Sequence, residues 1–241
     1  MAEEKTKKSE KITSNSENSN ETIEKPFDYK KVNYQVIWVI VVLVAVLISF
    51  FATMWILSEA NKYDYIGLTF KKEMFGNIPL HTTQYTGYGA NGWPTSFKLA
   101  LRNDPRELSV PIEGKLKFIT SNLTYVSIDR ESGILGCSDS TIALSSLGIF
   151  MNNMKIIIKS AVTSQNASVE LNKTIVTCNN SLDNTVLIIT AGNESKIFQD
   201  KNNSNCYTLS VNNCEIVPVI ERFEVATIAE VNDEDIDGYD G

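Results

Sequence analysis

The stretch "VIWVIVVLVAVLISFFATMWIL", residues 36–57, decides how the rest of the chain is organised, because none of its 22 residues carries a charge. A helix of this length rises about 33 Å, which matches the hydrocarbon core of a bilayer. Tyr34, Trp38 and Trp55 lie near its two ends, where aromatic side chains gather at membrane interfaces. We therefore expect a transmembrane helix over 36–57, and neither a cleaved signal peptide nor a buried soluble helix.

The segment before this stretch is polar and electrically balanced. Residues 1–35 hold seven lysines and seven acidic residues, with few large apolar side chains. Such a composition cannot bury enough surface to fold, so we expect a disordered cytoplasmic tail over 1–35. The net charge of −7 therefore belongs to the rest of the chain, and much of it to residues 229–241, which we expect to be a second, acidic disordered tail. This acidity argues against nucleic acid as a partner.

Lysines flank the apolar stretch about equally, so the positive-inside rule alone leaves the orientation open. All four cysteines and six N-x-S/T glycosylation sequons, in contrast, follow residue 57. The cysteines are Cys137, Cys178, Cys206 and Cys214, and the sequons begin at Asn122, Asn166, Asn172, Asn179, Asn193 and Asn202. An even number of cysteines on one side indicates disulfides in an oxidising compartment. We expect a cytoplasmic N-terminus and a glycosylated extracytoplasmic domain over 60–228.

Alternating and β-branched patterns predict a domain that mixes strands with helices. Strands are expected at 66–72, 95–103, 115–120, 124–130, 155–162, 184–190 and 206–211, a helix at 139–154, and either a helix or a strand at 215–228. The order strand, helix, strand over 124–162 indicates a βαβ unit. We predict a mixed α/β (α+β) fold, in which an antiparallel N-terminal part joins a small, partly parallel sheet. An all-β sandwich is the alternative if 139–154 is not helical.

Four cysteines allow three pairings. If Cys137 and Cys178 both lie near the carboxyl ends of neighbouring strands, they are close enough to pair. A turn at Asn212–Asn213 would bring Cys206 and Cys214 together. We therefore predict the pairs 137–178 and 206–214. No C-x-x-C motif occurs and His81 is the single histidine, so we expect neither a zinc site nor any other cofactor, apart from weakly bound calcium.

Two surface stretches are candidate ligand contacts. "TGYGANGW", residues 86–93, together with Tyr85, presents the aromatic residues Tyr85, Tyr88 and Trp93, which suit contact with a glycan or a protein. An ordinary surface loop explains the stretch as well. Arg102 and Arg106 flank an Asn-Asp-Pro turn, where they would hold an anion or a sugar, or pair with nearby acids.

Two groups of acidic residues suggest other chemistry. Asp129, Glu131 and Asp139 follow a predicted strand, and paired carboxylates there would serve a surface hydrolase. Turn formation and helix capping explain them equally well. Asp233, Asp235 and Asp237, followed by glycine, begin like a calcium-binding loop. The bidentate glutamate of such a loop would fall at position 244, after Gly241, so we expect at most a weak calcium site in a solvated acidic tail.

Three stretches resemble uncharacterised single-pass membrane proteins of small-genome archaea. These are "FKKEMFGNIPL" (70–80), "LALRNDPRELSVPIEGKLKF" (99–118) and "CYTLSVNNCEIVPVIERF" (206–223). The resemblance covers roughly residues 65–225 and implies an archaeal envelope protein with an outward-facing domain. It carries over no catalytic residue.

These observations predict a non-enzymatic, membrane-anchored cell-surface protein. Its outer domain would bind or scaffold an envelope or partner-cell component, either a protein or a glycan. One alternative is a subunit of a filament similar to type IV pilins, which also place an apolar helix before a β-rich head. The polar residues 1–35 before the helix argue against it. The other alternative is a surface hydrolase that uses Asp129 and Asp139.

Overall fold

The computed structural model describes residues 29–89, 91–116, 123–180, 183–232 and 239–240. The chain divides into two compact units, Met1–Met54 and Trp55–Gly241. Helix α1 (Tyr29–Ala60) makes up the described part of the first unit and extends into the second. Its stretch Asn33–Ala60 is long and apolar enough to cross a membrane, and residues 33–57 are all exposed. The predicted apolar span therefore lies within one helix.

The second unit begins with a four-stranded antiparallel sheet, here called the meander. Its strands follow the chain in the order β1-β2-β3-β4. They are β1 (Lys62–Tyr65), β2 (Leu68–Phe75), β3 (Ile78–Tyr88) and β4 (Pro94–Leu101). The meander is the antiparallel part that the sequence predicts. The expectation that 86–93 is wholly a loop is wrong, because β3 continues to Tyr88 and pairs there with Pro94.

The rest of the unit is built on a second sheet, here called the mixed sheet, whose described strands have the order β11-β5-β9-β10-β8-β6-β7. They are β5 (Ile112–Glu113), β6 (Leu123–Ile128), β7 (Ile157–Val162), β8 (Thr185–Ala191), β9 (Lys196–Gln199), β10 (Cys206–Val211) and β11 (Tyr239–Asp240). Strands β7, β6, β8 and β10 are mutually parallel, and β9 is antiparallel to β10. The predicted partly parallel sheet is confirmed.

Helices connect the parallel strands. Helix α2 (Ser140–Asn153) follows β6 and precedes β7, which confirms the predicted βαβ unit. Two short 3-10 helices, Arg130–Ser132 and Ile134–Gly136, come before α2. Helix α3 (Gln165–Leu171) was not predicted, and it begins where Ser164 accepts a hydrogen bond from the amide of Ala167. The helices at 140–153 and 216–232 exclude the all-β sandwich.

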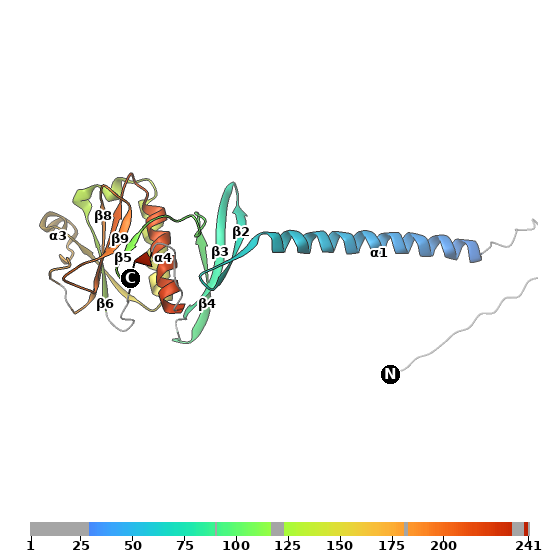
Figure 1. The fold of residues 1–241 in the computed structure, drawn as a ribbon, viewed down its shortest axis with the longest axis horizontal. Coiled ribbons are helices and arrows are strands. Elements are labelled where there is room, and N and C mark those ends of the chain that lie inside the picture. Colours follow the sequence, from blue (N-terminus) through green and yellow to red (C-terminus); the bar gives the residue numbers. More distant parts are fainter. Residues whose placement is uncertain (1–28, 90, 117–122, 181–182, 233–238, 241) are drawn as a thin grey trace, which may run out of the picture. The chain divides into compact units, whose positions relative to one another are not determined.

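Helix α4 (Ile216–Asn232) forms the middle layer of the unit, because it lies between the meander and the mixed sheet (Figure 1). Every side chain of residues 219–229 is buried, and the core includes α4 residues together with residues of both sheets. Pro218 lies in the first turn, where a missing amide hydrogen costs no helical hydrogen bond. The stretch that sequence left open as helix or strand is a helix buried on all sides.

The domain extends past its predicted end at residue 228. Ala229 is fully buried in the core, and α4 continues to Asn232. The predicted acidic tail therefore does not begin at 229. Asp233, Asp235 and Asp237, the candidate calcium ligands, lie outside the described residues, as does the sequon residue Asn122.

The cysteines form two disulfides, but the predicted pairing is wrong. Cys137 pairs with Cys214, and Cys178 pairs with Cys206. Because β6, β8 and β10 are parallel, Cys137 and Cys214 follow the carboxyl ends of β6 and β10. Cys178 and Cys206 lie at the opposite, amino-terminal edge. The uninterrupted strand β10 separates Cys206 from Cys214, so no turn can join them.

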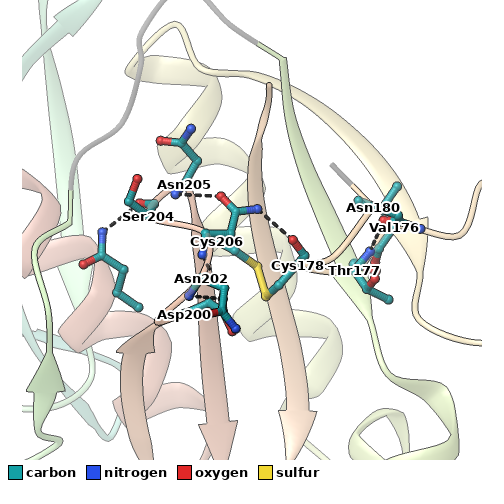
Figure 2. Close-up of a disulfide and its surroundings, with 12 residues drawn as sticks. Val176, Thr177, Cys178, Asn180, Asp200, Asn202, Ser204, Asn205 and Cys206 are labelled. Atoms are coloured by element: carbon teal, nitrogen blue, oxygen red, sulfur yellow. Dashed lines mark hydrogen bonds between the residues drawn. A yellow bond between two sulfur atoms is a disulfide. The ribbon is translucent and has the colours of Figure 1, made fainter. Parts of the chain in front are cut away.

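The two disulfides tie different parts of the domain. The 137–214 bond joins the segments that lead into α2 and α4, and α2 packs against α4 in the middle layer. The 178–206 bond is embedded in a local asparagine network, shown in Figure 2. There Asn203 Nδ2 donates to the carbonyl of Cys178 at 2.8 Å, and Asn180 Oδ1 accepts from the amide of Thr177 at 2.7 Å.

Non-reducing peptide mapping tests this pairing directly. Digestion of the alkylated, unreduced chain should yield linked peptides that contain Cys137 with Cys214, and Cys178 with Cys206. Recovery of a peptide that links Cys137 to Cys178 would contradict the parallel arrangement of β6, β8 and β10.

A glycine substitution tests how closely the meander packs on the middle layer. A Cβ added to Gly87 of β3 would clash with the carbonyl oxygen of Asn153 at the end of α2 and lie 2.9 Å from Phe97 Cδ2. We expect Gly87→Ala to lower the free energy of unfolding by about 1–3 kcal/mol, measured by urea unfolding. The matched control is Gly148→Ala within α2, where a Cβ meets no atom within 4 Å. It should be neutral or stabilising by up to about 1 kcal/mol, and equal losses in both variants would contradict this packing.

Candidate functional site

A mostly apolar groove of about 600 Å³ opens between the meander and the ends of helices α2 and α4. It is lined by Gly67, Leu68, Gln84, Tyr85, Thr86, Tyr88, Pro94, Met154, Ile228 and Val231. These residues come from three distant stretches of the chain, which meet because β3 crosses the carboxyl-terminal ends of both helices. Concave, largely apolar surfaces with a few polar groups are typical of binding sites.

The three aromatic residues predicted as ligand contacts lie in and beside this groove, but they have different environments. Tyr85 is buried, with its ring 5.6 Å from that of Phe150 and its hydroxyl accepting a hydrogen bond from Asn153 Nδ2 at 3.2 Å. Burial raises the pKa of the Tyr85 phenol. Tyr85 is thus part of the groove floor.

Tyr88 and Trp93, in contrast, offer exposed aromatic surface, with 47% and 70% of their areas accessible. The backbone around Trp93 is held in a tight connection. Its carbonyl accepts from the amide of Gly89 at 2.9 Å, and its own amide donates to Asn91 Oδ1 at 3.1 Å. A rigid backbone that presents an exposed indole lowers the entropy lost when a partner binds.

The two candidate arginines are both engaged with acids of the domain. Arg106 binds Asp104 through two nitrogens, at 2.9 and 2.6 Å, and Arg102 Nη1 lies 3.2 Å from Asp139 Oδ1. Both arginines therefore form ion pairs with nearby acids, which is the second of the two roles that the sequence suggested for them. Asp139 is accordingly an ion-pair partner as well as the residue that precedes α2.

A cluster that sequence reasoning missed surrounds the single histidine. His81 is 6% exposed, and its Nδ1 lies 2.6 Å from the hydroxyl of Tyr63, with which it shares a hydrogen bond. The Arg106 guanidinium lies 3.8 Å from the centre of the Tyr63 ring, and Asp104 Oδ2 lies 3.9 Å from His81 Nδ1. Tyr63, His81, Asp104 and Arg106 thus form one cluster where the Asn-Asp-Pro turn meets the meander.

The electrostatics of this cluster favour a structural role. The hydrogen bonds from Arg106 lower the pKa of Asp104 to about 2, so this carboxylate stays ionised. Burial lowers the pKa of His81, which keeps the imidazole neutral at pH 7, and burial with the nearby Asp104 charge raises the pKa of Tyr63. The neutral, buried imidazole of His81 is hydrogen-bonded to Tyr63 and so links β3 to β1. This favours a structural role for His81 over contact with a substrate.

The carboxylates proposed for hydrolysis are also held within the fold. Asp129 accepts hydrogen bonds from Thr190 Oγ1 at 2.8 Å and Thr163 Oγ1 at 3.2 Å. Glu131 Oε1 accepts from Asn166 Nδ2 at 3.3 Å. Asp129 therefore links the end of β6 to β8 and to the end of β7. This structural role accounts for the carboxylate at this position.

Two buried glutamates of α4 are the most unusual titratable groups in the second unit. Glu221 accepts hydrogen bonds from the amides of Arg102 and Asn103 and from Asn103 Nδ2, the last at 2.6 Å. Glu224 is fully buried, and Ser146 Oγ donates to its Oε1 at 3.0 Å. Its Oε2 has no hydrogen-bond partner among the described residues. Burial raises the pKa of Glu221, and it raises that of Glu224 to about 8. The sequence could have indicated these buried glutamates, because they are the acidic residues of the largely apolar stretch 216–229.

The sequons lie away from the groove. Asn166, Asn172, Asn179, Asn193 and Asn202 are all exposed, and they belong to the segments around the mixed sheet. The sequence of the meander, residues 62–101, contains no sequon. Within the part of the chain that the structure describes, no group of three or more His, Cys, Asp or Glu side chains is placed to hold a metal ion.

Comparison of the chain with protein-family models, with curated proteins and with solved structures finds no match.

The buried Glu224 predicts a specific dependence of stability on pH. Folded Glu224 keeps its proton to about pH 8, whereas the unfolded side chain releases it near the ordinary value of 4.5. Its contribution to stability is therefore complete below pH 4.5 and is lost as the pH rises towards 8. The loss amounts to at most about 1.4 kcal/mol per pH unit. We expect Glu224→Gln to flatten the fall of the unfolding free energy between pH 5 and 8, measured by urea unfolding of the detergent-solubilised chain.

The matched control is Glu107→Gln, because Glu107 is exposed in the turn after the meander. It should leave the slope of stability against pH unchanged. An unchanged slope in Glu224→Gln would show that the buried carboxyl does not retain its proton.

Proposed function

We propose that this chain is a membrane-anchored cell-surface protein whose outer domain binds an envelope protein in the groove beside Tyr88 and Trp93. The observation that carries this proposal is the juxtaposition of two features. One is an apolar helix with every side chain of residues 33–57 exposed, and the other is a disulfide-bonded domain with an aromatic groove.

Exposure of the helix favours lipid as its surroundings. Moving one large aliphatic side chain from water to an apolar environment is favourable by about 1.5–3 kcal/mol. Helix α1 exposes a continuous run of such side chains, for which water is a very unfavourable solvent. A bilayer, in contrast, matches both the length and the composition of Asn33–Ala60.

The disulfides and the sequons support an extracytoplasmic location for the domain. All four cysteines are paired, and such bonds persist in oxidising compartments. The exposed sequon asparagines are accessible to a glycosylating enzyme, so we propose a glycoprotein with glycans on the mixed-sheet side. The meander and its groove would stay free of glycans. The resemblance to archaeal envelope proteins stays a prediction consistent with this location.

The chemistry of the groove favours a protein over a glycan as its occupant. Aliphatic and thioether side chains of Leu68, Met154, Ile228 and Val231 line much of it. The half-exposed Tyr88 lines it as well, and the exposed Trp93 directly precedes the lining residue Pro94. Tyrosine and tryptophan are enriched at the centres of protein interfaces, where apolar anchors fill such pockets. Sugars instead need several convergent polar groups, of which the groove lining supplies Gln84 and Thr86.

Site-directed photo-crosslinking in cells that produce the full chain tests this function. A photoreactive phenylalanine derivative at position 88 should give one dominant adduct with an envelope protein. Trp93→Ala in the same chain should reduce the yield of that adduct several-fold, because it removes the exposed indole next to Pro94 of the groove lining.

The control is the same photoreactive residue at position 169 on α3, where Val169 is 74% exposed. It should give no such adduct. Identical adducts at both positions would contradict the groove as the binding surface. An adduct that glycosidase treatment removes would show that the occupant is a glycan.

A further inference from the structure

Among the described strands, β7 forms one edge of the mixed sheet, and the chain itself closes both ends of its outer side. At the carboxyl end, the amide of Val162 donates to the carbonyl of Thr174 at 3.1 Å, and its carbonyl accepts from the amide of Val176 at 2.9 Å. Directly before the strand, the amide of Ile156 donates to the carbonyl of Met151 at 3.0 Å. Between these two ends, the described partner of β7 is β6 on its inner side.

The middle of this edge presents free backbone groups. In a parallel ladder, successive residues direct their amide and carbonyl to alternate sides of the strand. Val162 directs both groups outward, so Ser160 and Ile158 do the same. Within the part of the chain that the structure describes, no segment pairs with these two residues on the outer side. The open stretch, residues 157–161, therefore offers two donors and two acceptors over about 16 Å of extended chain.

The side chains of the open stretch are unusual for an uncovered edge. Ile157 and Ile158 are 60% and 40% exposed, and they lie on opposite faces of the strand. Sheet edges are usually blunted by charges, proline, a bulge or a covering segment, and an exposed apolar edge is a template for pairing with another strand. No sequon begins within residues 123–165, so the open stretch itself carries no N-linked glycan. The edge is therefore available to a further strand.

The charge of the edge selects the kind of strand that fits. Residues 152–164 contain Lys155 and Lys159 and no acidic residue. The Lys159 ammonium lies 5.9 Å from the centre of the Tyr125 ring, and neither lysine forms an ion pair within the described residues. A second copy of the chain, paired antiparallel through the same two outward residues, would bring Lys159 opposite its own equivalent, and such like charges destabilise a sheet. A carboxylate opposite Lys159 is instead attracted to it.

We propose that the outer edge of β7 at residues 157–161 binds an extended, acidic segment of another protein, which adds one strand to the mixed sheet. The backbone of that segment pairs with Ile158 and Ser160, and its carboxylate lies opposite Lys159. Main-chain hydrogen bonds supply the affinity in this mode of recognition, and the side chains supply the selectivity. This edge and the groove share no residue, so the proposal is independent of what the groove binds.

Fluorescence anisotropy of labelled peptides mixed with the detergent-solubilised full chain tests the proposal. The probe is a seven-residue peptide in which a central glutamate is flanked on each side by valine, threonine and glycine. It should bind, and the same peptide with lysine in place of the glutamate should bind several-fold more weakly. N-methylation of its three central residues should abolish binding, because it removes the backbone donors. Lys159→Glu in the chain should reverse the preference, so that the lysine peptide binds more tightly.

The matched control is Lys201→Glu, which makes the same change of charge at an exposed position between β9 and β10. It should leave the preference for the glutamate peptide unchanged, and a reversal there would mean that net charge, not the edge, selects the peptide. The proposal is overturned by that result, by a glutamate peptide that does not bind, or by binding that survives N-methylation. Ile158→Cys chains that become disulfide-linked to each other without peptide would show that a second copy occupies the edge, which also overturns it.

Discussion

The hydrogen bonds to the buried carboxylate of Glu221 connect the two halves of the outer domain. The turn that follows the meander has two amides, those of Arg102 and Asn103, that point into the protein, and Glu221 of α4 accepts from both. Without this acceptor each buried amide would cost about 1–3 kcal/mol. Arg222 on the next position donates to the hydroxyl of Tyr65 at 3.3 Å. Glu221 and Arg222, two neighbouring polar residues of the buried helix α4, thus hold the meander against the middle layer.

This constraint places the surfaces on which the proposed function depends. Because α4 is fixed against the turn after β4 and against α2, its last turns supply Ile228 and Val231 to the groove. The 137–214 disulfide ties the segments leading into α2 and α4 and so holds the two helices side by side. The same packing orders the meander, whose strands β3 and β4 supply other residues of the groove.

The periodicity of apolar residues along the sequence predicted many of the helices and strands. It did not predict the contacts between segments that are distant in the sequence. The expected helix at 139–154 and strand at 124–130 agree closely with α2 and β6, because their periodicity depends on neighbouring residues. The disulfide pairing failed because it depends on which strands are parallel neighbours. Gly87 and Tyr85 were assigned to a contact loop, although β3 contains both, since glycine and polar residues hide its alternation. The groove combines residues 67–94, 154 and 228–231, and no local pattern links these stretches.

The orientation of the chain in the membrane is the claim on which the proposed function rests. It is tested most directly by a membrane-impermeant amine reagent applied to intact cells, with the labelled lysines identified by mass spectrometry. Lys98, Lys159, Lys173 and Lys201 are exposed on the outer domain and should be labelled. Lys5, Lys7, Lys8 and Lys11, which precede the apolar helix, should be labelled only after the cells are permeabilised. Labelling of these four lysines in intact cells, with none after the helix, would contradict the account.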